Sequence, residues 1–207
     1  SRVTTAIEGK LGSDNKLVRT AASTMQNFFR GLGMSPERSE ASFTLKGEMG
    51  TSNQRAFDVM TSLYDALGSN KKSLERINAV LDPGISKIKV GEVELSASEK
   101  AVYTLLKQGF DLTHDISYAN KHISTDVYKA NMGKYTPRMY DVYEMPTEVS
   151  QFVTQGKKIA TDLYKSKKEL DQWKIDNSLN DPVYALGKRL SQVQTNTAIR
   201  KYTDFLG

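Results

Sequence analysis

Apolar residues recur every three or four positions from Leu95 to Met132, a stretch that contains no proline. This spacing matches the α-helical period and places the apolar side chains on one face. Ser96 and Glu99 form a capping-box pair, because each side chain can accept a hydrogen bond from the other residue's backbone N–H. The pattern predicts one long helix over about 97–132 and restricts the chain to folds built from packed helices. Its predicted buried positions are Val102, Leu105, Leu106, Leu112, Ile116, Ile123 and Val127.

Two further helices are predicted in the second half of the chain. Thr147 is placed to cap a long helix over about 148–175, where apolar residues follow the same period. Asp181 followed by Pro182 is typical of an N-cap and the first helical position, which predicts a last helix running toward Phe205.

Shorter amphipathic stretches predict helices at about 15–29, 53–67 and 71–81. Residues 34–50 are polar, with three serines and two glycines, so they are predicted to form a long irregular loop that is either a binding element or partly disordered. The inner side of the 53–67 helix is predicted to consist of Phe57, Met60, Leu63, Tyr64 and Leu67.

Residues 85–95 alternate between apolar and polar side chains, which predicts a minor β-hairpin. The predicted fold is therefore all-α: a single elongated helical bundle over residues 1–207, with that hairpin as its one β element. Smaller helices occupy residues 1–84, and the long-helix bundle occupies residues 96–207. The first residue is serine instead of methionine, which suggests a processed product or a piece of a much longer polypeptide.

Composition excludes several kinds of site. The chain has no cysteine, so disulfides and thiolate chemistry are excluded. His114 and His122 are the only histidines, and on one helix they would lie about 12 Å apart, too far to bind one metal ion. No apolar run approaches the roughly 20 residues needed to span a bilayer. We predict no cofactor.

No catalytic motif is present, so we predict that the chain is not an enzyme. The nucleophile elbow, the zinc-binding His-Glu-x-x-His pattern and the glycine-rich phosphate loops are all missing. His114 could act as a general base oriented by Asp111 or Asp115, but we interpret it as a solvated helix histidine. An alternative hypothesis is a carboxylate hydrolase site in the 34–50 loop, built from Glu37, Glu40 and Glu48.

A net charge of +5, from 29 basic and 24 acidic residues, permits weak attraction to nucleic acid. The best candidate basic surface consists of Lys157, Lys158, Lys165, Lys167, Lys168, Lys188 and Arg189. Acidic residues lie among these lysines at spacings that form salt bridges, so a solvated, salt-bridged face is the favoured interpretation. Tyr135, Tyr140 and Tyr143 could stack on single-stranded bases, although a core or interface role is favoured.

Four stretches, in order, resemble a known family: Leu11-Gly-Ser-Asp-Asn-Lys-Leu-Val-Arg-Thr-Ala-Ala, Gly50-Thr-Ser-Asn-Gln-Arg-Ala-Phe, Leu95-Ser-Ala-Ser-Glu-Lys-Ala-Val-Tyr-Thr-Leu-Leu-Lys and Tyr135-Thr-Pro-Arg-Met-Tyr-Asp. They are similar to helix starts, and to the exit of a helix, in internal virion (core or ejection) proteins of short-tailed bacteriophages. Related giant phage virion proteins, including virion-packaged RNA polymerases, share these elements. The resemblance covers about residues 5–145.

The resemblance implies a structural and assembly domain that is packaged inside the capsid and ejected with the genome, assisting DNA delivery across the host envelope. Its implied partners are other virion proteins or copies of itself, with non-specific phage DNA as a further possibility. It implies a location in the virion, followed by delivery into the host envelope or cytoplasm. The alternative is a nucleic-acid-binding accessory domain flanking a virion-packaged RNA polymerase. The family supplies no catalytic residues.

Overall fold

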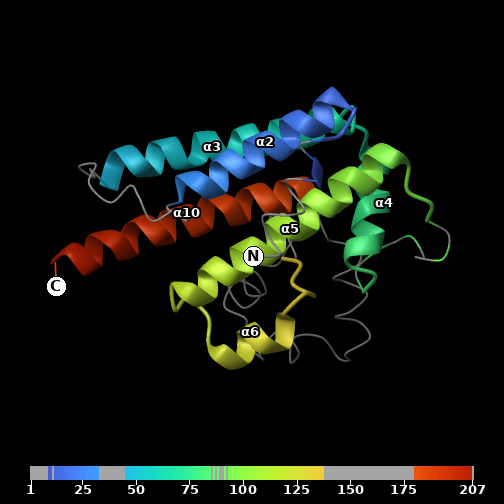
Figure 1. Ribbon diagram of the computed structural model, residues 1–207. Coiled ribbons are helices and arrows are strands. Elements are labelled where there is room, and N and C mark those ends of the chain that lie inside the picture. Colours follow the sequence, from blue (N-terminus) through green and yellow to red (C-terminus); the bar gives the residue numbers. More distant parts are fainter. Residues whose placement is uncertain are drawn as a thin grey trace, which may run out of the picture.

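The computed structural model describes residues 9–10, 12–32, 45–84, 86, 88, 91, 93–137 and 180–206. These residues contain six α-helices and no β-strand, which confirms the predicted all-α class (Figure 1). The helices are α2 (Lys16–Gly31), α3 (Leu45–Ala66), α4 (Lys71–Leu81), α5 (Ala97–Ala119), α6 (Thr125–Asn131) and α10 (Pro182–Leu206).

Three helices form one layer of the fold. α3 packs against both α2 and α10, and it runs in the opposite direction to each of them (Figure 1). α5 crosses beneath α10 and also contacts α2, α3 and α4. The short helix α6 contacts α5 near its C-terminal end. Helices from both predicted parts of the chain, 1–84 and 96–207, therefore pack together.

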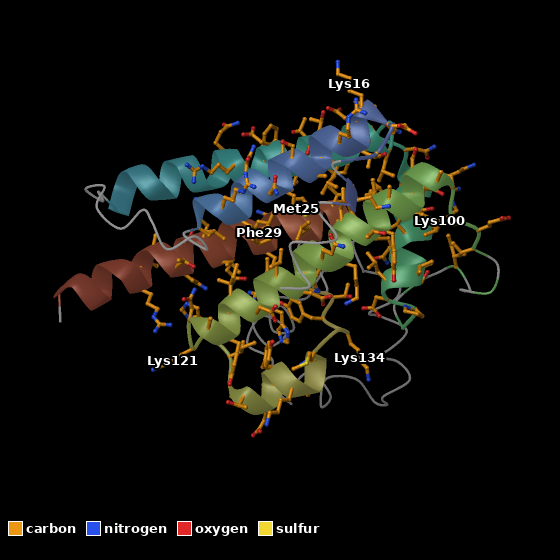
Figure 2. All side chains as sticks on the ribbon, in the orientation of Figure 1. Lys16, Met25, Phe29, Lys100, Lys121 and Lys134 are labelled. Atoms are coloured by element: carbon orange, nitrogen blue, oxygen red, sulfur yellow. The ribbon has the colours of Figure 1, made fainter. Side chains whose placement is uncertain are left out.

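One hydrophobic core joins α2, α3, α4, α5 and α10. Its centre consists of large side chains with almost no exposed surface, because each faces a neighbouring helix. In Figure 2, Met25 and Phe29 of α2 lie between the helices, whereas the labelled lysines point outward. The largest fully buried side chains include Phe28, Phe110, Met25, Leu63, Ile77, Leu105, Leu106, Leu186 and Leu190.

Side-chain caps begin several of the helices. The Asn15 side chain accepts hydrogen bonds from the backbone N–H groups of Leu17 and Val18, and Asn70 accepts from Lys72. Both hydrogen bonds of the predicted capping box at Ser96 and Glu99 are present. Each cap satisfies backbone donors that have no partner inside the helix.

The predicted long helix over 97–132 is wrong, because α5 ends at Ala119. The backbone N–H of His122 donates to the Ser117 carbonyl and that of Lys121 donates to the Tyr118 carbonyl, both at 2.9 Å. Lys121 has a positive φ of 59°, so this ending is a Schellman motif with lysine in the left-handed position. Ser124 then caps α6.

The chain reversal at Lys121 also changes which residues are buried. Val127, which was predicted to face the core, is 47% exposed on α6.

Phe57 of α3 is 60% exposed, contrary to its predicted inward position. The other four residues predicted for the inner side of that helix are buried or half-buried.

α3 begins at Leu45, so the last part of the predicted 34–50 loop is helical. No proline lies between Leu45 and Ala66, and the two glycines near its start weaken a helix without removing its backbone donors. The predicted hairpin is not confirmed: Ser86, Ile88, Gly91 and residues 93–95 are not in strands, and the rest of 85–95 lies outside the described residues. The Ile88 N–H instead donates to the Ser86 hydroxyl at 3.0 Å. The predicted 148–175 helix lies entirely outside the described residues.

Two glycines allow close approach of helices around α10. A Cβ atom at Gly187 would stand 1.9 Å from Sδ of Met60 on α3, and one at Gly109 of α5 would stand 2.9 Å from the methyl groups of Leu186. The absence of a side chain at both positions therefore lets α10 fit between α3 and α5.

Candidate functional site

Four aromatic rings stack one on the next where α5, α6 and the following segment meet. Tyr118 stacks on Tyr128 with ring centroids 4.2 Å apart, and Tyr128 stacks on His114 at 4.9 Å. His114 in turn stacks on Tyr135 at 4.6 Å, with the two planes only 8° from parallel. We call Tyr118, Tyr128, His114 and Tyr135 the aromatic run.

Local backbone structure brings these rings together. His114 and Tyr118 lie one helical turn apart on α5, so they share a face. The left-handed Lys121 turns the chain back, and α6 then presents Tyr128 to both rings. Gly133, with a φ of 68°, makes a second turn that precedes Tyr135.

His114 is buried, which contradicts its interpretation as a solvated helix histidine. The residue is only 2% exposed, and its Nε2 atom has no hydrogen-bond partner among the described residues. Burial lowers the pKa of His114; Asp115 and Asp111 oppose this change, whereas the positive charges of Arg189 and Lys107 add to it. The imidazole is therefore held in its neutral form.

Hydrogen bonds around His114 do not orient it as a general base. The carboxylate of Asp115 accepts from the Tyr128 hydroxyl at 2.7 Å, and that of Asp111 accepts from Lys107 Nζ at 2.9 Å. Neither carboxylate accepts a hydrogen bond from the His114 Nε2 atom. The hydrogen bond to Asp115 raises the pKa of Tyr128, so this phenol stays protonated. The cluster is thus a neutral, packed contact between α5 and α6.

Arg189 of α10 borders the aromatic run. Its guanidinium carbon lies 5.6 Å from the centre of the Tyr135 ring, and Nη2 donates to the Ser117 hydroxyl at 2.8 Å. Nη1 donates to Gln192 at 2.7 Å, while the buried Nε atom finds no partner in the described residues. Arg189 therefore ties α10 to α5 and closes one end of the run.

The predicted basic surface is only partly visible. Lys157, Lys158, Lys165, Lys167 and Lys168 lie outside the described residues. Lys188 is exposed and lies 5.4 Å from the centre of the Tyr184 ring. Arg189, the next residue, is half-buried, and its Nη1 and Nη2 atoms both donate within the protein. The structure therefore places these two neighbours in different environments.

Other described lysines do not gather on one face. Lys16, Lys100, Lys121 and Lys134 are all exposed, and Figure 2 shows them at well-separated points around the molecule. A scattered distribution gives a weaker local field than a clustered one.

The carboxylates of the hypothetical hydrolase site are not placed. Glu37 and Glu40 lie outside the described residues, and Glu48 lies in α3 with its side chain likewise outside them. Among the side chains that are described, no group of three or more histidine, aspartate or glutamate residues could hold a metal ion. None of the described helices is long and apolar enough to cross a membrane.

Comparisons of the chain with protein-family models, with curated proteins and with solved structures gave no match.

Sequence patterns missed the aromatic run, although one signal was present. His114 and Tyr118 lie four residues apart, which places them on the same face of a helix. Tyr128 and Tyr135 could not be added, because a continuous helix to residue 132 carries both of them away from His114.

Proposed function

We propose that the chain is a structural and assembly domain of a bacteriophage internal virion protein, packaged in the capsid and delivered with the genome. Its partners are other virion proteins or further copies of itself. It works by holding a helical scaffold together, and no catalysis is assigned to it.

One observation carries this proposal: the described parts of the four family-like stretches lie in one packed unit. The first, second and third stretches lie in or next to α2, α3 and α5, which contact one another. Asn15 of the first stretch donates to Ser98 of the third at 3.5 Å. Tyr135 of the fourth stretch stacks on His114 of α5. If the four stretches belong to one structural module of the phage family, they should occur in the family's order and also pack together.

Polar side chains between the helices serve as ties, which further supports a scaffold role. The Tyr64 hydroxyl of α3 donates to Asp181 at 2.7 Å, immediately before α10. Asn120, which follows α5, donates to Thr197 of α10 at 2.9 Å. Thr24 of α2 and Ser62 of α3 share a hydrogen bond of 2.6 Å. These side chains fix the positions of the helices, and their hydrogen-bonding groups are already engaged within the protein.

The absence of cysteine also fits delivery through a narrow conduit. No disulfide has to be reduced before the chain can unfold, since the sequence contains no cysteine. A domain held by helix packing and hydrogen bonds loses its structure cooperatively and reversibly under moderate force or denaturant.

Purified particles of the encoding phage provide the test. Quantitative mass spectrometry should find the chain in full particles and find it depleted from capsids emptied by triggered genome release. The major capsid protein, which stays with the shell, is the control. Absence of the chain from full particles would overturn the proposal.

The nucleic-acid-binding alternative makes a different prediction for the isolated chain. Binding to duplex DNA through several phosphate contacts weakens steeply as salt rises. The scaffold proposal expects little binding at about 0.15 M salt, where surface charges are screened within roughly 8 Å. Strong binding with a steep salt dependence would favour the accessory-domain alternative.

A further inference from the structure

Among the described residues, the contacts that attach the short helix α6 to α5 are mainly aromatic. None of its residues is buried. Its side-chain contacts with α5 consist of Tyr128, which stacks on His114 and Tyr118 and donates to Asp115, and Thr125, whose hydroxyl lies 3.4 Å from that of Tyr118. Whatever weakens the aromatic run therefore weakens the attachment of α6.

We propose that His114 is a pH-sensitive latch: in its neutral form it holds the 120–137 segment against α5, and its protonation releases that segment. The inference stands independently of the proposed function. It follows from the position of the imidazole within the aromatic run, where both Tyr128 and Tyr135 stack on it.

Protonation would place a charge where the protein offers it no hydrogen-bond acceptor at Nε2. Both ring nitrogens of a protonated imidazole carry N–H groups, and Nε2 is buried without a partner in the described structure, so its N–H would have neither water nor an acceptor. An open segment would expose the imidazole to water and remove this cost. Protons therefore favour the open state.

Charged groups from each packed element act on the same imidazole. Arg189 of α10 and Lys107 of α5 disfavour a second positive charge, whereas Asp111 and Asp115 of α5 favour it. Both carboxylates are already engaged, by Lys107 and by the Tyr128 hydroxyl of α6. The faces of Tyr128 and Tyr135 would attract a cation weakly. Desolvation outweighs these attractions, because burial is the largest influence on His114.

Two sharp turns bound α6 within the 120–137 segment. Lys121 and Gly133 both have positive φ, so the backbone reverses direction sharply on either side of α6. Only Tyr135 packs against the hydrophobic core from within this segment. Release therefore costs few buried apolar contacts and leaves the core formed by α2, α3, α5 and α10 in place.

The intact chain can be tested directly, since its two histidines give two imidazole signals in an NMR titration. His122→Gln leaves His114 as the only one. We expect His114 to titrate below the usual histidine value of about 6.5. A midpoint at or above that value would overturn the latch.

Hydrogen exchange between about pH 7.5 and about pH 5, corrected for the intrinsic pH dependence of exchange, measures the release. His114 has a lower pKa when the segment is closed than when it is open. Between these two pKa values, protection of residues 120–137 should fall by up to about tenfold per pH unit, while protection of α2 stays unchanged. Equal losses in α2, or no loss in 120–137, would overturn the proposal.

Two variants complete the experiment. His122→Gln should keep the pH response of the 120–137 segment, whereas His114→Gln should abolish it. A response that persists in His114→Gln contradicts the latch. If His114→Gln fails to fold, the wild-type comparison still decides, because the NMR midpoint of His114 must coincide with the loss of protection.

Discussion

Arg76 of α4 donates to the carboxylate of Glu99, with Nε 3.1 Å from Oε1, and so joins α4 to the first turn of α5. The other carboxylate oxygen of Glu99 accepts from the Ser96 backbone N–H at 2.8 Å. One side chain with 3% of its surface exposed thus closes the capping box and binds a second helix. Its negative charge is satisfied by both contacts.

Glu99→Gln should therefore destabilise the protein by about 2 kcal/mol, because the side chain loses its negative charge and its –NH2 group can no longer accept a hydrogen bond. The partial exposure of Arg76 keeps the cost below that of a fully buried pair. Urea denaturation measures the change. Glu94→Gln is the matched control, since Glu94 is exposed, and it should change the free energy of unfolding by less than about 0.5 kcal/mol. Equal effects of both variants would contradict the assignment.

The same carboxylate predicts a dependence on acid pH. Burial raises the pKa of Glu99, but hydrogen bonds from Arg76, Ser73 and the Ser96 backbone, together with the Arg76 charge, outweigh it and lower the pKa to about 2 from 4.5. The unfolded state therefore binds a proton before the folded state does. The stabilisation is complete above about pH 4.5 and is lost as pH falls toward about 2.

Comparing wild type with Glu99→Gln isolates this contribution from that of the other carboxylates. The difference in their free energies of unfolding should shrink by about 2 kcal/mol between those two pH values. Chemical denaturation at a series of pH values checks it. A difference that stays constant down to pH 2 would show that the Glu99 charge does not stabilise the fold.

Arg189 and Lys188 are adjacent in sequence but should respond differently to substitution. Arg189→Gln removes the hydrogen bond to Ser117 and the contact with Tyr135, so it should destabilise the protein by about 1–3 kcal/mol. Lys188→Gln should cost less than about 0.5 kcal/mol, because that side chain is exposed. Thermal unfolding of the two variants distinguishes them. Similar small effects would indicate that Arg189 is free to bind another partner.

Gly187→Ala should lower stability even though alanine favours helices. Its methyl group would collide with Sδ of Met60, and the resulting shift should cost about 1–3 kcal/mol, which exceeds the gain of about 1 kcal/mol in helix propensity. Met60→Ala in the same chain removes the obstacle. A double-mutant cycle should therefore show favourable coupling between the two substitutions, and strict additivity would contradict the close approach.

The sequence predicted helix starts best where a capping residue directly precedes a stretch with helical spacing of apolar residues. Ser96 with Glu99, and Asp181 with Pro182, place the starts of α5 and α10 correctly because capping is a local interaction. The apolar residues of α5 from Val102 to Ile116 are buried as predicted.

Tertiary contacts decided what the patterns could not. The break at Lys121 contains no glycine or proline. The apolar spacing therefore continues across it to Val127 and wrongly predicted one continuous helix. Phe57 lies seven residues before Tyr64, in phase on the helix, but it falls outside the surface that α2 and α10 cover and remains exposed. The burial of His114 depends on Tyr128 and Tyr135, which reach it only because of the reversal at Lys121. Local spacing carries no information about such partners.

The position of α10 has a consequence for how the chain acquires its structure. This helix packs against α3, where Gly187 faces Met60, and against α5, where Leu186 faces Gly109. It is nevertheless separated from α6 in the sequence by all the residues between Asn131 and Pro182. Contacts between segments so far apart in the sequence are entropically costly to form, and they slow folding. During synthesis, the earlier helices must wait with an open apolar face until α10 leaves the ribosome. A chaperone that binds exposed apolar segments would find its target in that interval.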